Sequence, residues 1–320
     1  MTALEDWDEG PFQAEAVTVR VPAKINLSLS VGPLREDGYH ELVTVFHAVS
    51  LYDEVTARAD RRLSLSVEPL RHDSDIAGVP DDERNLAWQA AVLLAEHTGI
   101  NPEVRLTIRK DIPVAGGMAG GSADAAAALV ACDALWDTRL TRDELGELAA
   151  KLGSDVPFAL HGGTAIGTGR GERISPVLAA TGLDWVIAVL PDGLSTPQVF
   201  EACDLLRRKS ADPIPEPGVH SELMSALRTR NAGLVGAALY NDLQPASIEL
   251  LPKIGEVLAL GSAAGAAGSL VSGSGPTTVF LVDSPLAAAD VEEALRTSGL
   301  CRTVRRARGP VTGANVINIR

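Results

Sequence analysis

Apolar and polar residues alternate along residues 16–33. Apolar side chains occupy every second position from Ile25 to Val31, and Asn26 and two serines lie between them. A period of two is typical of a β-strand with one buried face, and Lys24 lies where this alternation starts. Similar stretches predict further strands at residues 41–50, 53–58, 62–68 and 103–109.

Helix signals follow in the same half of the chain. Thr141 and Glu144 form a capping-box pattern, and residues 122–136 are rich in alanine, which has the highest helix propensity. The sequence predicts helices over residues 85–98, 122–136 and 142–152, the first closed by Gly99 and the third by Gly153. It also predicts a hairpin over residues 164–177, with a purely structural turn at Gly169, Arg170 and Gly171.

The pattern restarts after residue 180, so we expect two domains, residues 15–180 and 181–310. Strands and helices are interleaved without a regular alternation, which predicts the α+β fold class. The Pro-rich stretch 209–218 is expected to be a surface loop, and the tails 1–14 and 309–320 to be loosely ordered. The elements predicted in this half are strands at 184–190, up to Val271, at 277–283 and at 302–308, and helices after Thr196 and Pro197 and at 219–229, 246–260 and 286–297.

Composition and net charge exclude some classes of binding partner. The 320 residues are 46% hydrophobic and 22% charged, and 28 basic against 42 acidic residues give a formal charge of −14. A field of this sign repels nucleic-acid phosphates and anionic lipid, so we expect neither nucleic acid nor membrane as a partner. An anionic small molecule would need a local positive pocket. The widely spaced Cys132, Cys203 and Cys301 favour a cytoplasmic location without disulfides or a zinc site.

A glycine-rich loop leads directly into the Ala-rich helix. Glycines let the backbone approach a ligand closely, and a helix N-terminus adds unpaired N–H donors and the positive end of its dipole, so the loop is a candidate anion cradle. It lacks the lysine of a P-loop and the G-x-G-x-x-G spacing of a dinucleotide fold. The alternative is a plain connection between a strand and a closely packed helix. The loop consists of Pro113, Val114, Ala115, Gly116, Gly117, Met118, Ala119, Gly120, Gly121 and Ser122.

Three further features carry candidate chemistry. The loop SGSGP at 272–276, which contains Ser274 and Gly275, could add backbone donors, although such a loop is more often a simple turn. Asp155 follows a Gly-Ser pair, where an acidic residue usually caps a helix. The segment 35–42, REDGYHEL, places an aromatic ring and an imidazole on a polar loop, where they could stack on a base and hydrogen-bond to it. The alternative is a loop aromatic tucked back onto the fold.

Three separated segments together resemble the GHMP kinase superfamily. They are PAKINL at 22–27, PVAGGMAGGSADAAAAL at 113–129 and SGSGPTTV at 272–279, in the order and with the spacing of the three superfamily motifs. Four further segments, AKINLSL, RxDGYHEL, GSDVPF and TPQVF, resemble the branch that phosphorylates 4-diphosphocytidyl-2-C-methyl-D-erythritol in the non-mevalonate route to isoprenoid precursors. The resemblance implies a two-domain kinase with its active site between the domains.

The resemblance also implies roles for individual residues. ATP, with Mg²⁺, would donate its γ-phosphoryl group to the 2-hydroxyl of the methylerythritol unit, Asp155 would be the general base and Lys24 the catalytic lysine. The glycine loop would cradle the phosphates of ATP, with the adenine toward residues 85–98. The residues implied at the acceptor substrate are Asn26 beside Lys24, Tyr39 and Phe200 sandwiching the cytosine, His40 bonding to it, and Thr196, Ser274 and Gly275.

The loop departs from the superfamily pattern at three positions. Ala119 and Ala123 replace glycine and serine, which should be tolerated, and Asp124 replaces the usual asparagine. A carboxylate there adds negative charge near a triphosphate, so it should face Mg²⁺ or solvent, and the metal ligand stays open. A kinase of another small alcohol, such as homoserine or mevalonate, and a non-catalytic ligand sensor remain alternatives. The oligomeric state, monomer or homodimer, is also open.

Overall fold

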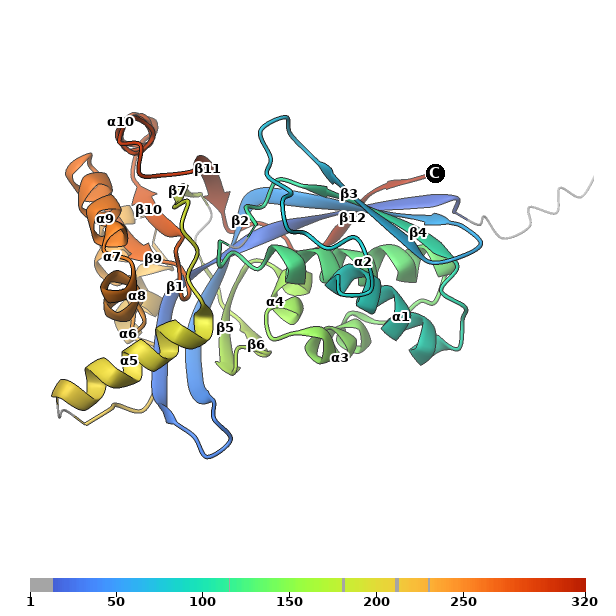
Figure 1. The fold of residues 1–320 in the computed structure, drawn as a ribbon, viewed down its shortest axis with the longest axis horizontal. Helices are drawn as coiled ribbons and strands as arrows, with labels where there is room; N and C mark the ends of the chain where they lie inside the picture. Colours follow the sequence, from blue (N-terminus) through green and yellow to red (C-terminus); the bar gives the residue numbers. More distant parts are fainter. Residues whose placement is uncertain (1–13, 115, 180–181, 211–212, 230) are drawn as a thin grey trace, which may run out of the picture.

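The computed structural model describes residues 14–320 except 115, 180–181, 211–212 and 230. Within this part of the chain, eight strands form one sheet and four form a second sheet (Figure 1). The first sheet contains β1 (Ala16–Leu34), β2 (His40–Ala59), β3 (Ser64–Pro69), β4 (Val104–Lys110), β5 (Thr164–Gly169), β6 (Arg173–Pro176), β8 (Tyr240–Asn241) and β12 (Asn315–Ile319).

Four helices cover one face of the first sheet (Figure 1). They are α1 (Leu86–Thr98), α2 (Gly120–Trp136), α3 (Arg142–Leu152) and α4 (Val156–His161). The alanine side chains of α2 are almost all buried, because a small side chain lets the helix lie close to both the sheet and α1. The predicted caps are confirmed: Gly99 adopts the left-handed conformation, and Thr141 with Glu144 forms the capping box of α3.

The second sheet has the order β11-β7-β10-β9, and the remaining helices lie at the same end of the molecule (Figure 1). Its strands are β7 (Leu183–Val189), β9 (Gly268–Val271), β10 (Thr278–Val282) and β11 (Thr303–Gly309). The helices are α5 (Thr196–Ser210), α6 (Ser221–Ala226), α7 (Ala232–Ala237), α8 (Gln244–Leu250), α9 (Lys253–Ala263) and α10 (Pro285–Thr297). No helix in the described part of the chain combines the length and apolar character that a membrane span requires.

The antiparallel pairing of β1 with β2 runs from Ala16 opposite Arg58 to Leu34 opposite His40. The sequence predicts two strands at 41–50 and 53–58, but β2 is continuous. The polar residue Asp53 does not break the strand, because its fully buried carboxylate has partners inside the fold. β2 then pairs with β5 near its beginning and with β4 near its end, so this ladder joins both parts of the sheet.

The prediction of a loose C-terminal tail is wrong. β12 pairs with Val17–Arg20 of β1, and thus the chain returns from the second sheet to the first. The side chains of β12 are all exposed, so the strand is held by its backbone hydrogen bonds to β1 rather than by a buried face. The N-terminal tail falls on residues 1–13, which lie outside the described residues.

Other differences from the predicted elements have local causes. The single helix predicted at 246–260 is divided into α8 and α9, because Pro252 cannot donate a backbone hydrogen bond within a helix. The short elements α4, α7 and β8 were not predicted. The hairpin predicted at 164–177 is present as β5 and β6. Of the loop predicted at 209–218, residues 213–218 form a loop, residues 209–210 belong to α5, and residues 211–212 lie outside the described residues.

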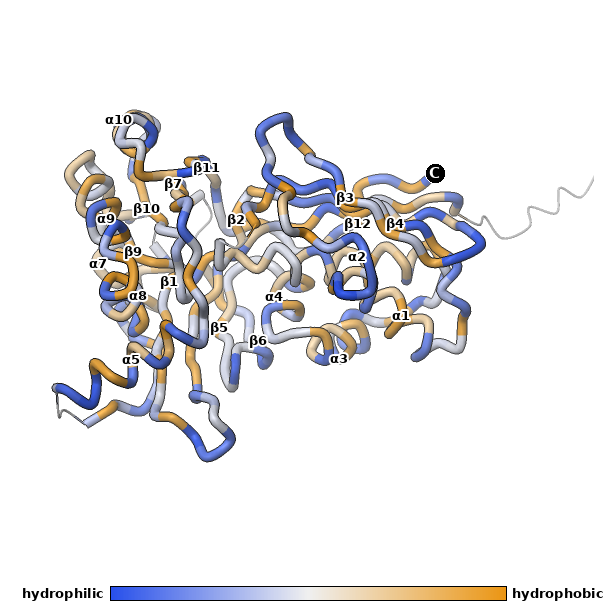
Figure 2. The backbone as a smooth tube through the Cα atoms, viewed as in Figure 1, coloured by the Kyte–Doolittle hydropathy of each residue, from blue (hydrophilic) through white to orange (hydrophobic). Residues whose placement is uncertain are grey.

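The two sheets share one hydrophobic core. The largest cluster of buried residues contains side chains of β1, β2 and α2 and also Trp185, Ile187 and Leu281 from the second sheet. Figure 2 shows apolar colouring along the strands and the inner helices, and polar colouring at the loop tips. The domain bounds of 15–180 and 181–310 stay a prediction.

His47 of β2 is fully buried where the two sheets meet. Its Nδ1 atom lies 2.9 Å from Thr164 Oγ1, and its ring centroid lies 5.9 Å from that of Trp185. A Cβ atom at Gly309 would lie 2.3 Å from His47 Nε2, so only glycine fits opposite the ring. Burial lowers the pKa of His47 to about 3, and the imidazole is neutral in the folded protein.

We predict that His47 makes the protein sensitive to acid. The unfolded chain binds a proton at His47 below about pH 6.5 and the folded protein does not, so the free energy of unfolding falls by about 1.4 kcal/mol per pH unit from this group. In urea unfolding between pH 7.5 and pH 4.5, His47→Gln should have a smaller slope than the wild type. The exposed His97→Gln variant is the control, and equal slopes for wild type and His47→Gln would contradict the prediction.

Candidate active site

A cleft of about 1140 Å³ lies between the first sheet with its helices and the elements around α5. Most of the candidate residues come together here. The glycine-loop residue Ser122 and Gly275 of the second loop do not line the cleft, and Ala115 lies outside the described residues. Those that line it are Lys24, Asn26, Tyr39, His40, Asp155, Thr196, Phe200, Ser274, Pro113, Val114, Gly116, Gly117, Met118, Ala119, Gly120 and Gly121.

Lys24 and Asp155 are far apart in the sequence and face each other in the cleft. Lys24 Nζ lies 3.8 Å from Asp155 Oδ2 and donates a hydrogen bond of 2.9 Å to Asn26 Oδ1. Lys24 is buried in the middle of β1, whereas the side chain of Asp155 is 29% exposed. Asp155 occupies the N-cap position of α4 but makes no capping hydrogen bond from its side chain, so its carboxylate is available to a ligand.

Asn26 fixes this pair to the second loop. Its Nδ2 donates to Thr44 Oγ1 at 2.8 Å, and its backbone N–H donates to Ser272 Oγ at 3.2 Å. From the other side, Asn241 Nδ2 donates to the carbonyl groups of Val271 and Gly273. The loop at 272–276 is therefore held directly over β1 and is more than a simple turn.

The glycine loop contacts both β1 at Lys24 and the second loop. A Cβ atom at Gly117 would lie 3.3 Å from the carbonyl oxygens of Ser272 and Gly275, so the two loops approach as closely as backbones can. The Lys24 N–H donates to Met118 O at 3.3 Å. Ala119 has a φ of 59° and is the N-cap of α2, which leaves the first N–H groups of this helix beside the cleft.

The left-handed conformation of Ala119 explains why glycine is usual at this position. A side chain in this conformation costs about 1 kcal/mol, because its Cβ approaches the following carbonyl oxygen. The residue is only partly buried, so its methyl group has room, and tolerance of the replacement stays a prediction.

Asp124 does not face bulk solvent but is paired with a buried lysine, a partner that the sequence analysis did not predict. It is 1% exposed, and its Oδ2 accepts a hydrogen bond of 2.7 Å from Lys110 Nζ. Lys110 also contacts Asp53 Oδ2 at 2.5 Å, and Asp53 Oδ1 accepts from the backbone N–H groups of Asp111 and Ile112. The lysine that neutralises Asp124 lies at the end of β4, and no motif pointed to it.

Burial and the neighbouring charges both shift the pKa values of Asp53 and Lys110. Removal from water raises the pKa of Asp53; Lys110 opposes this, and the charge of Asp124 adds to it. Burial disfavours the charge on Lys110, but the two carboxylates outweigh this effect and raise its pKa. Lys110 is thus a fixed cation beneath the glycine loop, where a Cβ atom at Gly120 would lie 3.1 Å from its Nζ.

One end of the cleft is aromatic. Tyr39 is 53% exposed, and the Arg170 guanidinium lies over its ring at 5.0 Å from the centroid. On the other side, the rings of His40 and Phe200 are stacked with centroids 5.1 Å apart. Arg170 belongs to the hairpin turn taken above as purely structural, but it lines the cleft.

Sequence reasoning missed several residues that line the cleft. Lys110 and Arg170 belong to segments predicted only as a strand end and a turn. Asp204 and Arg208 follow Phe200 at intervals of four, a spacing that places them on the same face of α5, and this signal could have revealed them. Residues 78–80 and 84–86 line the opposite end, next to the start of α1.

We predict that Lys110→Met strongly destabilises the protein. The substitution leaves the carboxylates of Asp53 and Asp124 buried together without a cation, which should lower the free energy of unfolding by about 3–5 kcal/mol. Urea unfolding at pH 7.5 measures this loss, and the exposed Lys151→Met serves as a control. The double variant with Asp124→Asn should recover part of the loss; a loss below about 1 kcal/mol for Lys110→Met alone would refute the prediction.

Comparison with known proteins agrees with this arrangement. The family descriptions "GHMP kinases N terminal domain" and "GHMP kinases C terminal" match residues 85–163 and 223–299. The 4-diphosphocytidyl-2-C-methyl-D-erythritol kinase of Mycolicibacterium smegmatis is 54% identical over 302 residues, which cover 94% of this chain and 92% of that protein. The protein of the same name from Thermobifida fusca is 54% identical, with 94% and 98% covered.

Solved structures give the same result. A crystal structure of 4-(cytidine 5'-diphospho)-2C-methyl-D-erythritol kinase superposes with a TM-score of 0.73 at 33% identity, covering 91% of this chain and 99% of that one. The homoserine kinase from Cytophaga hutchinsonii superposes with a TM-score of 0.73 at 19% identity, covering 95% and 98%, and so shares the fold. The chain belongs to the GHMP kinase superfamily and, within it, to the 4-diphosphocytidyl-2-C-methyl-D-erythritol kinase family.

Proposed function

We propose that the protein transfers the γ-phosphoryl group of ATP to the 2-hydroxyl of 4-diphosphocytidyl-2-C-methyl-D-erythritol, with Asp155 as the general base. The observation that carries the proposal is the Lys24–Asp155 pair, 3.8 Å apart and directly beside the glycine loop. Phosphoryl transfer needs in-line positioning and stabilisation of charge on the transferred group, and a cleft lined by both loops can provide both.

Asp155 and Lys24 have different roles in this reaction. An alcohol is a weak nucleophile, so a carboxylate within hydrogen-bond reach assists by accepting its proton as the new O–P bond forms. Asp155 takes this proton, while the bond from phosphorus to the β-phosphate oxygen breaks and ADP leaves. Lys24, held by Asn26 Oδ1, stabilises the charge that develops on the phosphoryl oxygens.

The phosphates of ATP occupy the glycine loop and the N-terminus of α2. The free N–H groups of this helix and its dipole supply local positive potential in a protein whose overall charge is −14. The adenine extends toward residues 78–86, at the far end of the cleft from Tyr39. Lys110, beneath the loop, adds a buried cation at this end.

Magnesium is compatible with the side chains near these phosphates. Mg²⁺ in kinases is commonly held by one or two carboxylates, phosphate oxygens and water. The described residues include no cluster of three or more His, Cys, Asp or Glu side chains placed for a metal. Asp124, however, has a buried Oδ1 atom without a hydrogen-bond partner among them. Asp124 would hold the ion together with the phosphates, and the bound ion would neutralise charge on the transferred group.

The aromatic end of the cleft receives the cytosine. Tyr39 and Phe200 supply flat faces for stacking, and His40 lies beside Phe200 with its ring in the same wall. Homoserine and mevalonate contain no nucleobase that could lie between these rings. This end of the cleft therefore favours the cytidylyl substrate over the smaller alcohols. The proposal takes the enzyme to be cytoplasmic and to be a monomer or a homodimer.

Asp155→Asn should lower kcat by about 10²–10⁴-fold, because the amide cannot accept the proton of the alcohol. ATP affinity, measured by calorimetry, should stay within about threefold, since Asp155 does not belong to the glycine loop. The exposed Asp143→Asn on α3 is the control for the loss of one negative charge. Turnover of Asp155→Asn within a few-fold of the wild type would exclude Asp155 as the base.

Tyr39→Ala should weaken binding of the cytidylyl substrate and leave binding of ATP nearly unchanged. Loss of one base-stacking face is worth about 1–3 kcal/mol, which corresponds to a KM increase of roughly 5- to 150-fold. Tyr39→Phe keeps the ring and should restore most of the affinity. If Tyr39→Ala raises KM for ATP as much as KM for the cytidylyl substrate, cytosine does not stack on this ring.

A further inference from the structure

One face of α5 forms the wall of the cleft at its aromatic end. Thr196, Phe200, Asp204 and Arg208 follow one another at intervals of four residues, and all four line the cleft. Thr196 Oγ1 lies 2.9 Å from Ser274 Oγ, so the first turn of the helix is fixed to the second loop.

The far end of α5 is fastened to β1 by Arg207. Its guanidinium donates to Val31 O at 2.8 Å and to Gly32 O at 3.2 Å, and it forms an ion pair of 3.1 Å with Asp242. Asp242 in turn accepts a hydrogen bond of 2.7 Å from the N–H of Val31. The helix is therefore held at both ends, and the position of Asp204 between them is set by this framework.

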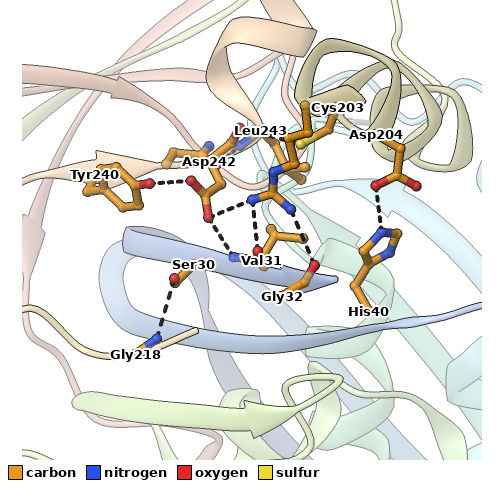
Figure 3. A network of polar contacts seen from close by, with 12 residues as sticks. Ser30, Val31, Gly32, His40, Cys203, Asp204, Gly218, Tyr240, Asp242 and Leu243 are labelled. Atoms are coloured by element: carbon orange, nitrogen blue, oxygen red, sulfur yellow. Dashed lines mark hydrogen bonds and ion pairs between the residues drawn. The ribbon is translucent and has the colours of Figure 1, made fainter. Parts of the chain in front are cut away.

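Asp204 makes a direct contact with His40. Asp204 Oδ1 lies 3.0 Å from His40 Nε2 (Figure 3), and the two side chains are only 13% and 7% exposed. A carboxylate can only accept, so the Nε2 atom of the ring carries the hydrogen in this contact. In the neutral imidazole, the lone pair then lies on Nδ1. No group of the described residues hydrogen-bonds to His40 Nδ1.

We propose that Asp204 is a positioning residue that fixes His40 with Nδ1 as a hydrogen-bond acceptor and thereby selects a pyrimidine with an amino group over one with a carbonyl group. The proposal rests on the function proposed above and specifies how its nucleotide end is recognised. The stack of His40 on Phe200 holds the ring plane, and Asp204 determines which edge is a donor and which an acceptor.

Cytosine and uracil differ in the group that they would present to His40 Nδ1. The exocyclic amino group of cytosine donates a hydrogen bond, and it satisfies the lone pair of Nδ1. The corresponding carbonyl group of uracil would place an oxygen lone pair against it. A buried polar site that is left unpaired discriminates strongly against the wrong ligand. Cytidine diphosphate esters should accordingly bind better than uridine diphosphate esters.

Asp204→Asn tests the proposal with little change in size. The asparagine can turn its amide nitrogen toward Nε2, which moves the ring hydrogen to Nδ1 and converts the acceptor into a donor. The measurement is kcat/KM for 4-diphosphocytidyl-2-C-methyl-D-erythritol and for its uridyl analogue. The ratio of the two values should fall at least about tenfold in Asp204→Asn, chiefly through KM of the cytidyl substrate. An unchanged ratio would overturn the proposal.

Arg207→Gln separates base selection from support of the helix. This substitution loosens α5 without touching His40, so it should raise KM for the cytidyl and uridyl substrates by the same factor. Lys209, on the same helix as Arg207, forms an exposed ion pair with Glu249 of α8, and Lys209→Gln controls for loss of surface charge. If Arg207→Gln lowers the ratio as much as Asp204→Asn does, Asp204 serves only to support the helix and the proposal fails.

Direct binding keeps this inference separate from the proposed reaction. Calorimetry with CDP and UDP requires no turnover. The wild type should bind CDP at least about tenfold more tightly than UDP, and Asp204→Asn should abolish most of this difference. If wild-type protein shows the preference but no turnover, the proposed function fails and the inference stands. If it binds both nucleotides equally or neither, the inference fails whatever the turnover.

Discussion

The long antiparallel pairing of β1 with β2 is the interaction on which the site depends. β1 carries Lys24 and Asn26 in its buried middle and offers the carbonyl groups of Val31 and Gly32 to α5 at its end. β2 begins with His40, at the aromatic end of the cleft. Because one ladder carries Lys24 and Asn26 as well as His40, their spacing is fixed by backbone geometry rather than by flexible loops.

The charge around the glycine loop is opposite in sign to the overall charge of the protein. The chain is strongly acidic, but Lys24 and Lys110 are buried cations on either side of the glycine loop. Each is held by acceptors: Lys24 by Asn26 and Asp155, and Lys110 by two buried carboxylates. Such cations have fixed positions, and a fixed positive charge stabilises a developing negative one with little reorganisation.

The sequence predicts those parts of the site that depend on short segments. The glycine loop, the helix that follows it and the cap of α3 are specified by neighbouring residues, and all are found in the structure. The cluster around Lys110 depends instead on strand register and on the start of α2, which no local pattern encodes. β12 was missed for a related reason, since its exposed side chains carry no signal of its pairing with β1.

The most direct measurement is ADP release from Mg·ATP by the purified protein with different alcohols. The acceptors to compare are 4-diphosphocytidyl-2-C-methyl-D-erythritol, its parent phosphate without the cytidylyl group, mevalonate and homoserine. If the aromatic end of the cleft binds cytosine beside the Lys24–Asp155 pair, ADP should be released with the first acceptor alone. Equal or faster release with the parent phosphate, mevalonate or homoserine would contradict the assignment of the aromatic end to cytosine, and no release with any of them would contradict the assignment of Asp155 as a working base.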